Sequence, residues 1–234
     1  MSELRNRGAT LSANTMENEK TKSVVRELGS GMAAKSLIDA SPQQHGVVLK
    51  LHLPFVYNLI PSFLLSIIYS IGCLSFLLPS WKQRYLISCG SYLYKFKDQQ
   101  SKSPKGCPFD LATMSVDLIP KENSPHVGAL PPGFDAIICV STLRRKQYYA
   151  VRDREEAMLW VRSLTEAKQA VITRNLGHDK QMPYPQSWKH FDSLAAGLVK
   201  SKERIKERME TQNMREMEMT NFMDGGPLPR GYHG

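Results

Sequence analysis

The sequence lacks the short motifs that mark common catalytic centres. It contains no phosphate-binding P-loop, no dinucleotide fingerprint, no HExxH and no GxSxG pattern. Its six histidines fall mainly in segments expected to be loops and tails, and none stands at metal-ligand spacing from a cysteine or carboxylate. The sequence therefore predicts a protein that is not an enzyme and that uses no cofactor or metal.

Cysteine is also scarce, and its spacing excludes two further classes of protein. The chain has four cysteines, Cys73, Cys89, Cys107 and Cys139, with no CxxC pair among them. This argues against a zinc ribbon or a disulfide framework and favours reduced thiols in a cytosolic setting. The N-terminal residues lack the apolar core of a secretory signal, and Ser2 stands where myristoylation would need a glycine.

Formal charge is absent from one long stretch of an otherwise basic chain. The 30 residues from Leu51 to Ser80 carry no Asp, Glu, Lys or Arg, while the whole chain has a net charge of +9 and a pI near 9.4. The most apolar part, residues 59–79, matches the length of about 20 residues that crosses a bilayer. The basic balance favours a polyanionic partner, either nucleic acid or an anionic membrane surface.

The order of patterns along the chain suggests three regions. Residues 1–44 are polar and mixed in charge, and we expect them to be mostly disordered, with a short helix at 21–28. Residues 45–173 hold short β-like runs interrupted by the apolar segment 51–79, and end in a helix. Residues 174–234 form a charged helical extension from about Ser187 to Met223, followed by a loose tail.

The β-like runs and the first helix have clear periodicities. "KQRYLIS" and "SYLYKFK" flank Cys89-Gly90 and predict a hairpin, and further strands are expected in "FDLATMSVDLI", "FDAIICVSTL" and "RRKQYYAV". From Asp153 onward the apolar residues recur every three or four positions, which indicates one stripe of an amphipathic helix. The stripe consists of Ala157, Trp160, Val161, Leu164, Ala167 and Val171.

Together these parts resemble a pleckstrin homology (PH) domain. Gly46–Lys50 stands as the first strand, "WKQRYL" from Trp81 as the second, "YLYKFKD" as the third, and "YYAVRDREEAMLWVRSLTEA" as the last strand and capping helix. Trp160 falls where the family carries its characteristic tryptophan. The resemblance covers residues 46–173. It implies a mainly β fold with α: a seven-stranded antiparallel barrel capped by a C-terminal helix, here with a separate charged helix after it.

Basic residues on the expected second and third strands point to an anion-binding face. Alternate residues of a strand face the same side, so Lys82 and Arg84 project together, as do Lys95 and Lys97. Arg can grip a phosphate through two hydrogen bonds, while Lys acts as a movable charge. The resemblance adds Lys50 at the end of the first strand. It implies that Lys50, Lys82, Arg84, Lys95 and Lys97 bind phosphoinositide headgroups.

The apolar segment departs from the family, because Lys50 and Lys82 are 32 positions apart rather than about ten. Three accounts fit the segment: an apolar insertion in the loop between the first two strands that enters the bilayer, a transmembrane helix at 59–79, or a translated intron or alternative exon. A single crossing would leave Gly46–Lys50 on the far side of the membrane. Cys73–Pro79 would then have to serve as the first strand.

The leading hypothesis is a non-enzymatic adaptor on anionic cytoplasmic membranes that bear phosphoinositides. The charged helix at 187–223, a coiled-coil candidate, would engage a protein partner. The alternative is a protein-interaction scaffold of the same fold that has no specific lipid binding. One version of this alternative adds a single transmembrane anchor at 59–79. The "KSKERIKER" segment is the best candidate for nucleic-acid contact, but its interleaved glutamates argue against that partner. We therefore expect a cytoplasmic, membrane-associated protein.

Overall fold

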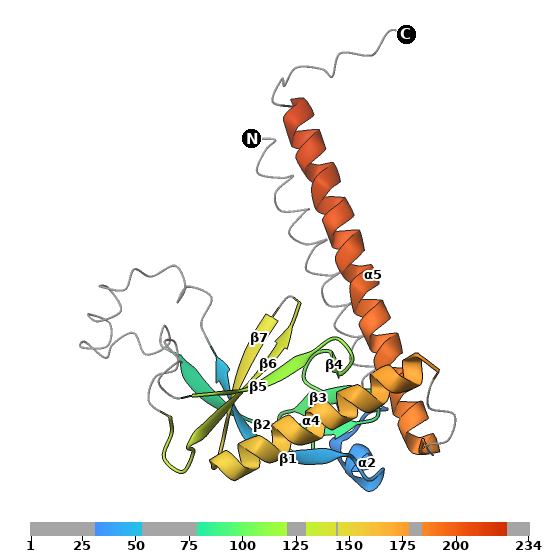
Figure 1. The fold of residues 1–234 in the computed structure, drawn as a ribbon. Coiled ribbons are helices and arrows are strands. Elements are labelled where there is room, and N and C mark those ends of the chain that lie inside the picture. The colour runs from blue at the N-terminus through green and yellow to red at the C-terminus, as the bar shows by residue number, and fades with distance from the viewer. Residues whose placement is uncertain (1–30, 53–78, 121–129, 144, 178–183, 224–234) are drawn as a thin grey trace, which may run out of the picture. The chain divides into compact units, whose positions relative to one another are not determined.

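A computed structural model describes residues 31–52, 79–120, 130–143, 145–177 and 184–223 (Figure 1). The chain divides into two compact units. One is Gly29–Ala195, and the other combines Met1–Leu28 with Ala196–Gly234. The helix predicted at 21–28 and the tail after Met223 lie outside the described residues.

The described part of Gly29–Ala195 is built on seven antiparallel strands. They are β1 (Gln44–His52), β2 (Ser80–Cys89), β3 (Tyr92–Phe96), β4 (Phe109–Asp110), β5 (Ser115–Ile119), β6 (Ala136–Thr142) and β7 (Arg145–Val151). Their order in the sheet is β4-β3-β2-β1-β7-β6-β5. Two meanders, β1–β4 and β5–β7, are thus joined where β1 pairs with β7 at Leu49↔Ala150 and Lys50↔Tyr149.

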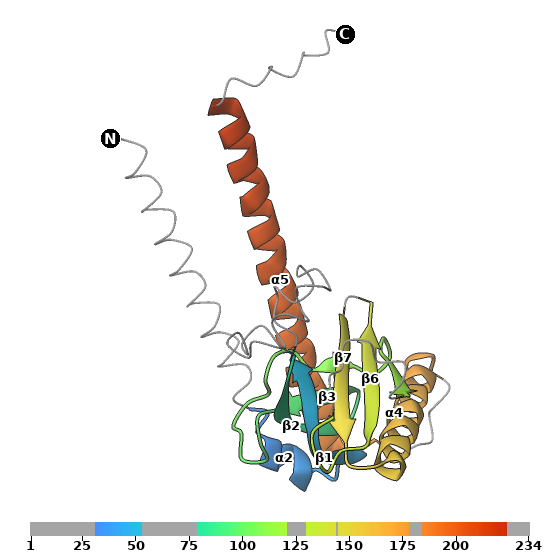
Figure 2. The same ribbon diagram turned by 90° about the vertical axis from the view of Figure 1, so that its left-hand side faces the viewer.

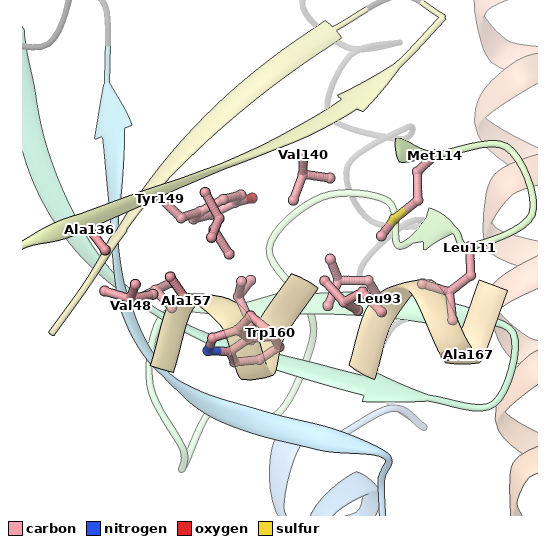
Figure 3. Packing of buried hydrophobic residues seen from close by; sticks show 14 of the residues in the cluster. Val48, Leu93, Leu111, Met114, Ala136, Val140, Tyr149, Ala157, Trp160 and Ala167 are labelled. Atoms are coloured by element: carbon pink, nitrogen blue, oxygen red, sulfur yellow. The ribbon is translucent and has the colours of Figure 1, made fainter. Parts of the chain in front are cut away.

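Helix α4 (Arg154–Asn175) follows the last strand and packs against the sheet. Asp153 caps its first turn by accepting a hydrogen bond of 2.7 Å from the Glu156 amide. The predicted stripe faces the core: Trp160 is fully buried and lies among Val48, Leu93 and Tyr149 (Figure 3). The predicted fold class, a mainly β PH-like sheet followed by a capping helix, is confirmed.

Two elements outside the predicted PH-like region complete this unit. Helix α2 (Ala34–Asp39) lies within the segment that we expected to be mostly disordered, and it packs near β2. Helix α5 (Gln186–Met223) begins inside the same unit, where the Trp188 indole donates to the Ala40 carbonyl at 2.8 Å. The compact unit therefore extends on both sides of the predicted limits 45–173.

These additions explain why the end of β2 is buried on both faces. Residues Tyr85 to Cys89 are all buried, although a strand with one solvated face would alternate. Leu86 belongs to the main core, whereas Ile87 and Cys89 point to the opposite side. On the same side, the Tyr94 hydroxyl donates to the Phe191 carbonyl at the start of α5. A second layer thus covers this part of the sheet.

The rest of α5 lies in the other unit and is a single charged helix, as predicted. It carries a Lys206–Glu210 ion pair at 3.2 Å, and Met209, Met214 and Met217 are exposed. None of the helices in the described ranges is both long enough and apolar enough to cross a membrane.

The apolar segment falls between β1 and β2, but residues 53–78 lie outside the described residues. Leu51 and His52, which we had placed in that segment, belong to β1 and pair with Trp81 and Ser80. Strands that are hydrogen-bonded side by side lie on the same side of any membrane. The predicted alternative of a single crossing at 59–79, with Cys73–Pro79 as first strand, is therefore wrong, because Gln44–His52 is the first strand. The pairing leaves the loop insertion and the translated intron open.

Candidate functional site

The register of β1 against β2 gathers basic side chains at one end of the sheet. Lys50 lies directly opposite Lys82, and Val48 lies opposite Arg84. Because alternate residues share a face, these three cations lie on the same face as Val48 and Leu86, which belong to the core. The inner face of β1 and β2 therefore changes from apolar to cationic toward the end of β1.

Strand β3 brings Lys95 to the same face, because Lys95 pairs with Leu86. The Lys95 side chain is half-buried, and its Nζ donates to Gln147 Oε1 at 3.4 Å. The same Gln147 oxygen accepts a hydrogen bond of 2.9 Å from the Tyr149 hydroxyl. Lys95 Nζ also lies 5.6 Å from the centre of the Phe109 ring. These contacts hold the Lys95 side chain against the inner face of the sheet.

Burial and the neighbouring cations both lower the pKa of lysines in this region. Burial, followed by the charge of Lys50, lowers the pKa of Lys95 to about 7. Burial also lowers the pKa of Lys50, and its hydrogen bond to Lys95 acts in the opposite direction.

Two further cations act on this region, and we did not predict them. Arg145, the first residue of β7, lowers the pKa of both Lys50 and Lys95, and Lys105 lowers that of Lys50. The Lys105 amide donates to the Lys95 carbonyl at 2.6 Å, which fixes the connection between β3 and β4 beside the site. We call the six residues that converge here the basic cluster: Lys50, Lys82, Arg84, Lys95, Lys105 and Arg145.

The predicted residue Lys97 is placed differently from the other four. It lies one position beyond the end of β3 and is exposed. No contact among the described residues links it to the basic cluster. The other predicted residues, Lys50, Lys82, Arg84 and Lys95, are brought together.

Local sequence patterns carry only a weak signal for the two cations that we did not predict. Arg145 and Lys105 are two of many surface Lys and Arg residues in a chain that has 31 of them. Arg145 belongs to the site because β7 pairs with β1, a contact between residues 99 positions apart at Lys50↔Tyr149. That pairing could have been anticipated only from the family architecture.

The basic cluster has no acidic counterpart in the part of the chain that the structure describes. The side-chain ion pairs recorded there, Arg162–Glu166 and Lys206–Glu210, are on helices. Like charges directly opposite on neighbouring strands, as at Lys50 and Lys82, are destabilising. The Arg84 Nε is buried and has no hydrogen-bond partner. This arrangement is suited to an anion that accepts several charge-assisted hydrogen bonds at once.

Comparison with known proteins finds likeness to solved structures only. No family model matches the sequence, and no curated protein matches it. Among solved structures, the chain is similar to the PH domain of human pleckstrin homology domain-containing protein family A member 5. That match has 14% identity over 56% of this chain and 80% of that chain, with a TM-score of 0.37.

Two other PH domains are similar to a comparable extent. The C-terminal PH domain of human pleckstrin matches with 14% identity over 55% of this chain and 89% of that chain, with a TM-score of 0.37. The Slm1 PH domain, in complex with phosphoserine, matches with 14% identity over 55% and 97%, with a TM-score of 0.34. The strand order and the helix that follows β7 give this chain a PH-like fold.

Proposed function

We propose that this chain is a non-enzymatic membrane-targeting module that binds phosphoinositide headgroups through the basic cluster. The observation that carries the proposal is the convergence of Lys50, Lys82, Arg84 and Lys95 on one inner face, with no carboxylate paired to them among the described residues. A headgroup with two or more phosphates supplies the missing negative charge. Phosphate oxygens also accept from the Arg84 Nε that lacks a partner.

Each cation of the cluster has a distinct part in this proposal. The planar guanidinium group of Arg84 can donate two hydrogen bonds to one phosphate, and the position of Arg84 beside the core restricts the motion of the side chain. Lys95, which is easily deprotonated in the free protein, regains its proton when an anion arrives. Lys82 is exposed at the rim and attracts the membrane surface, where each basic residue is worth about 1 kcal/mol.

Arg84→Gln should weaken binding of soluble inositol trisphosphate to the full chain about 10- to 100-fold, because a hydrogen bond to a charged group is worth about 1.5–3 kcal/mol. Isothermal titration calorimetry measures this change. Lys146→Gln is the matched control, because Lys146 is the next residue of β7 after Arg145 and faces the opposite side. Equal affinity of Arg84→Gln and the unchanged chain would refute the proposed site.

A protein-interaction scaffold of the same fold is the second candidate, and the exposed methionines of α5 favour it. Met209, Met214 and Met217 are more than half exposed, and methionine-rich surfaces adapt well to partner proteins. The first residues of α5 are engaged by their own unit, so a partner would bind after Ala195. In this case Arg84→Gln leaves localisation in cells unchanged, while removal of residues 196–223 abolishes it.

A further inference from the structure

The hairpin between β6 and β7 ends in an apolar side chain that is almost fully exposed. Leu143 is 98% exposed, the largest value among the exposed large hydrophobic residues of the described chain. The strands below it are paired continuously from Ala136↔Val151 to Thr142↔Arg145. The Thr142 hydroxyl also donates to the Arg145 carbonyl at 3.3 Å. Leu143 therefore stands at the end of two strands that are paired along their whole length.

The tip of this hairpin extends past the basic cluster. Strand β7 runs antiparallel to β1, with Tyr149 opposite Lys50 and Arg145 four residues nearer the tip. At about 3.3 Å per residue, Arg145 lies roughly 13 Å beyond the level of Lys50 along the strand. Figures 1 and 2 both show the yellow hairpin of β6 and β7 extending past the end of β1.

This reach exceeds the thickness of the headgroup region of a membrane. The headgroup region of one leaflet is about 5–8 Å thick, outside a hydrocarbon core of about 30 Å. A headgroup phosphate held at Lys50 and Arg84 would therefore place the hairpin tip beyond the headgroup region, among the acyl chains. Arg145 and Lys146, both exposed, lie two and three positions after Leu143, and their long side chains can extend back toward the phosphates.

We propose that Leu143 is a membrane wedge, which enters the acyl chains of the leaflet whose headgroup occupies the basic cluster. The proposal rests on the proposed function and deepens it, because it assigns the bilayer, and not a free inositol phosphate, as the partner. A free headgroup would contact the cluster without reaching the tip. A bilayer contacts both the cluster and the tip. Leu143 should therefore contribute to the affinity for vesicles and not to the affinity for a soluble headgroup.

The test compares vesicle and headgroup binding for the full chain and two leucine variants. Leu143→Ala should reduce partitioning onto phosphatidylcholine vesicles that contain a bisphosphorylated phosphoinositide about tenfold, from the loss of buried apolar area. It should leave the affinity for soluble inositol trisphosphate unchanged. Leu159→Ala is the matched control, because Leu159 is a 59% exposed leucine on α4.

The outcomes separate this inference from the proposed function. Unchanged vesicle partitioning of Leu143→Ala would overturn the wedge and favour a protein contact at the tip, while the headgroup site would stand. Equal loss in both assays would also overturn it, because the tip would then shape the cluster itself. If the unchanged chain binds neither vesicles nor inositol trisphosphate, both proposals fail.

Discussion

At the scale of single residues, the chemistry of Lys95 depends strongly on its surroundings. It is half-buried, contacts Gln147, and lies near Lys50, Arg84 and Arg145. In the free protein it is a poorly compensated cation, and such groups lower the stability of a fold. Residues that destabilise the free protein in this way are often those that bind a ligand.

Replacing Lys95 with methionine should therefore separate stability from binding. Lys95→Met keeps the length of the side chain and removes its charge, so we expect the unfolding free energy to rise by about 1 kcal/mol. Affinity for inositol trisphosphate should fall. Urea denaturation and calorimetry measure the two quantities. A variant that is less stable than the unchanged chain would show that Lys95 is well accommodated and would contradict this account.

The same residue should make stability depend on pH. The pKa of Lys95 is about 7 in the folded chain and 10.5 when unperturbed, so between these values the unfolded chain binds more protons. Unfolding free energy then rises as pH increases through this window. Denaturation of the unchanged chain and of Lys95→Met across the window should give a steeper rise for the former. Parallel profiles would contradict the low pKa.

At the scale of elements, the turn between β2 and β3 fixes the start of α5. The Ser91 amide and hydroxyl both donate to the Asp192 carboxylate, at 2.8 and 2.7 Å, and the Tyr184 hydroxyl donates to the same carboxylate. The Arg174 guanidinium stacks on the Tyr184 ring, 3.6 Å from its centre. The preceding Gly90 has a φ of +64° and lies close to this network.

Gly90→Ala tests how strongly this turn holds the helix. A Cβ at Gly90 would overlap the Asp192 carboxylate and lie 2.7 Å from the Tyr184 hydroxyl oxygen, in a backbone conformation that alanine disfavours. We expect a loss of about 2–3 kcal/mol in unfolding free energy. Gly106→Ala is the control, because Gly106 has a φ of +89° and no atom near its Cβ position. Equal losses in both variants would attribute the whole effect to backbone strain.

Local patterns predicted the elements whose burial follows from their own sequence. The stripe through Ala157, Trp160 and Leu164 fixed the helix and its buried face, and Cys89-Gly90 marked the hairpin turn. Helix α2 was missed because it is six residues long and its apolar residues, such as Leu37, are buried only through tertiary contacts. The double burial of β2 was missed for the same reason, since Asp192 is 101 residues from Ser91.

The candidate site was predictable to a similar extent. Period-two alternation brought Lys82 and Arg84 together, and the resemblance to PH domains supplied Lys50. Arg145 and Lys105 depend on long-range strand pairing and on the path of a loop, which local patterns do not contain. Lys97 has the right parity, but β3 ends before it.

At the scale of the whole molecule, the apolar segment and the basic cluster have a fixed relation in the chain. Residues 53–79 connect His52 to Ser80, which are paired residues of neighbouring strands. Their pairing places both ends of this connection at the cationic end of the sheet, where β1 ends and β2 begins. Lys50 and Lys82 are the next cations along each strand. Any contribution of this connection to membrane binding would therefore act beside the basic cluster.

The central claim is that the basic cluster directs the full chain to phosphoinositide-bearing membranes. Flotation with phosphatidylcholine vesicles, with and without a bisphosphorylated phosphoinositide, tests it most directly in the unchanged chain, Arg84→Gln and Lys35→Gln. Lys35 is an exposed lysine of α2, outside the basic cluster, and its loss changes the net charge equally. We predict that the unchanged chain and Lys35→Gln float only with phosphoinositide, and that Arg84→Gln does not float. Equal flotation of all three, or flotation of the unchanged chain with plain phosphatidylcholine, would contradict the account.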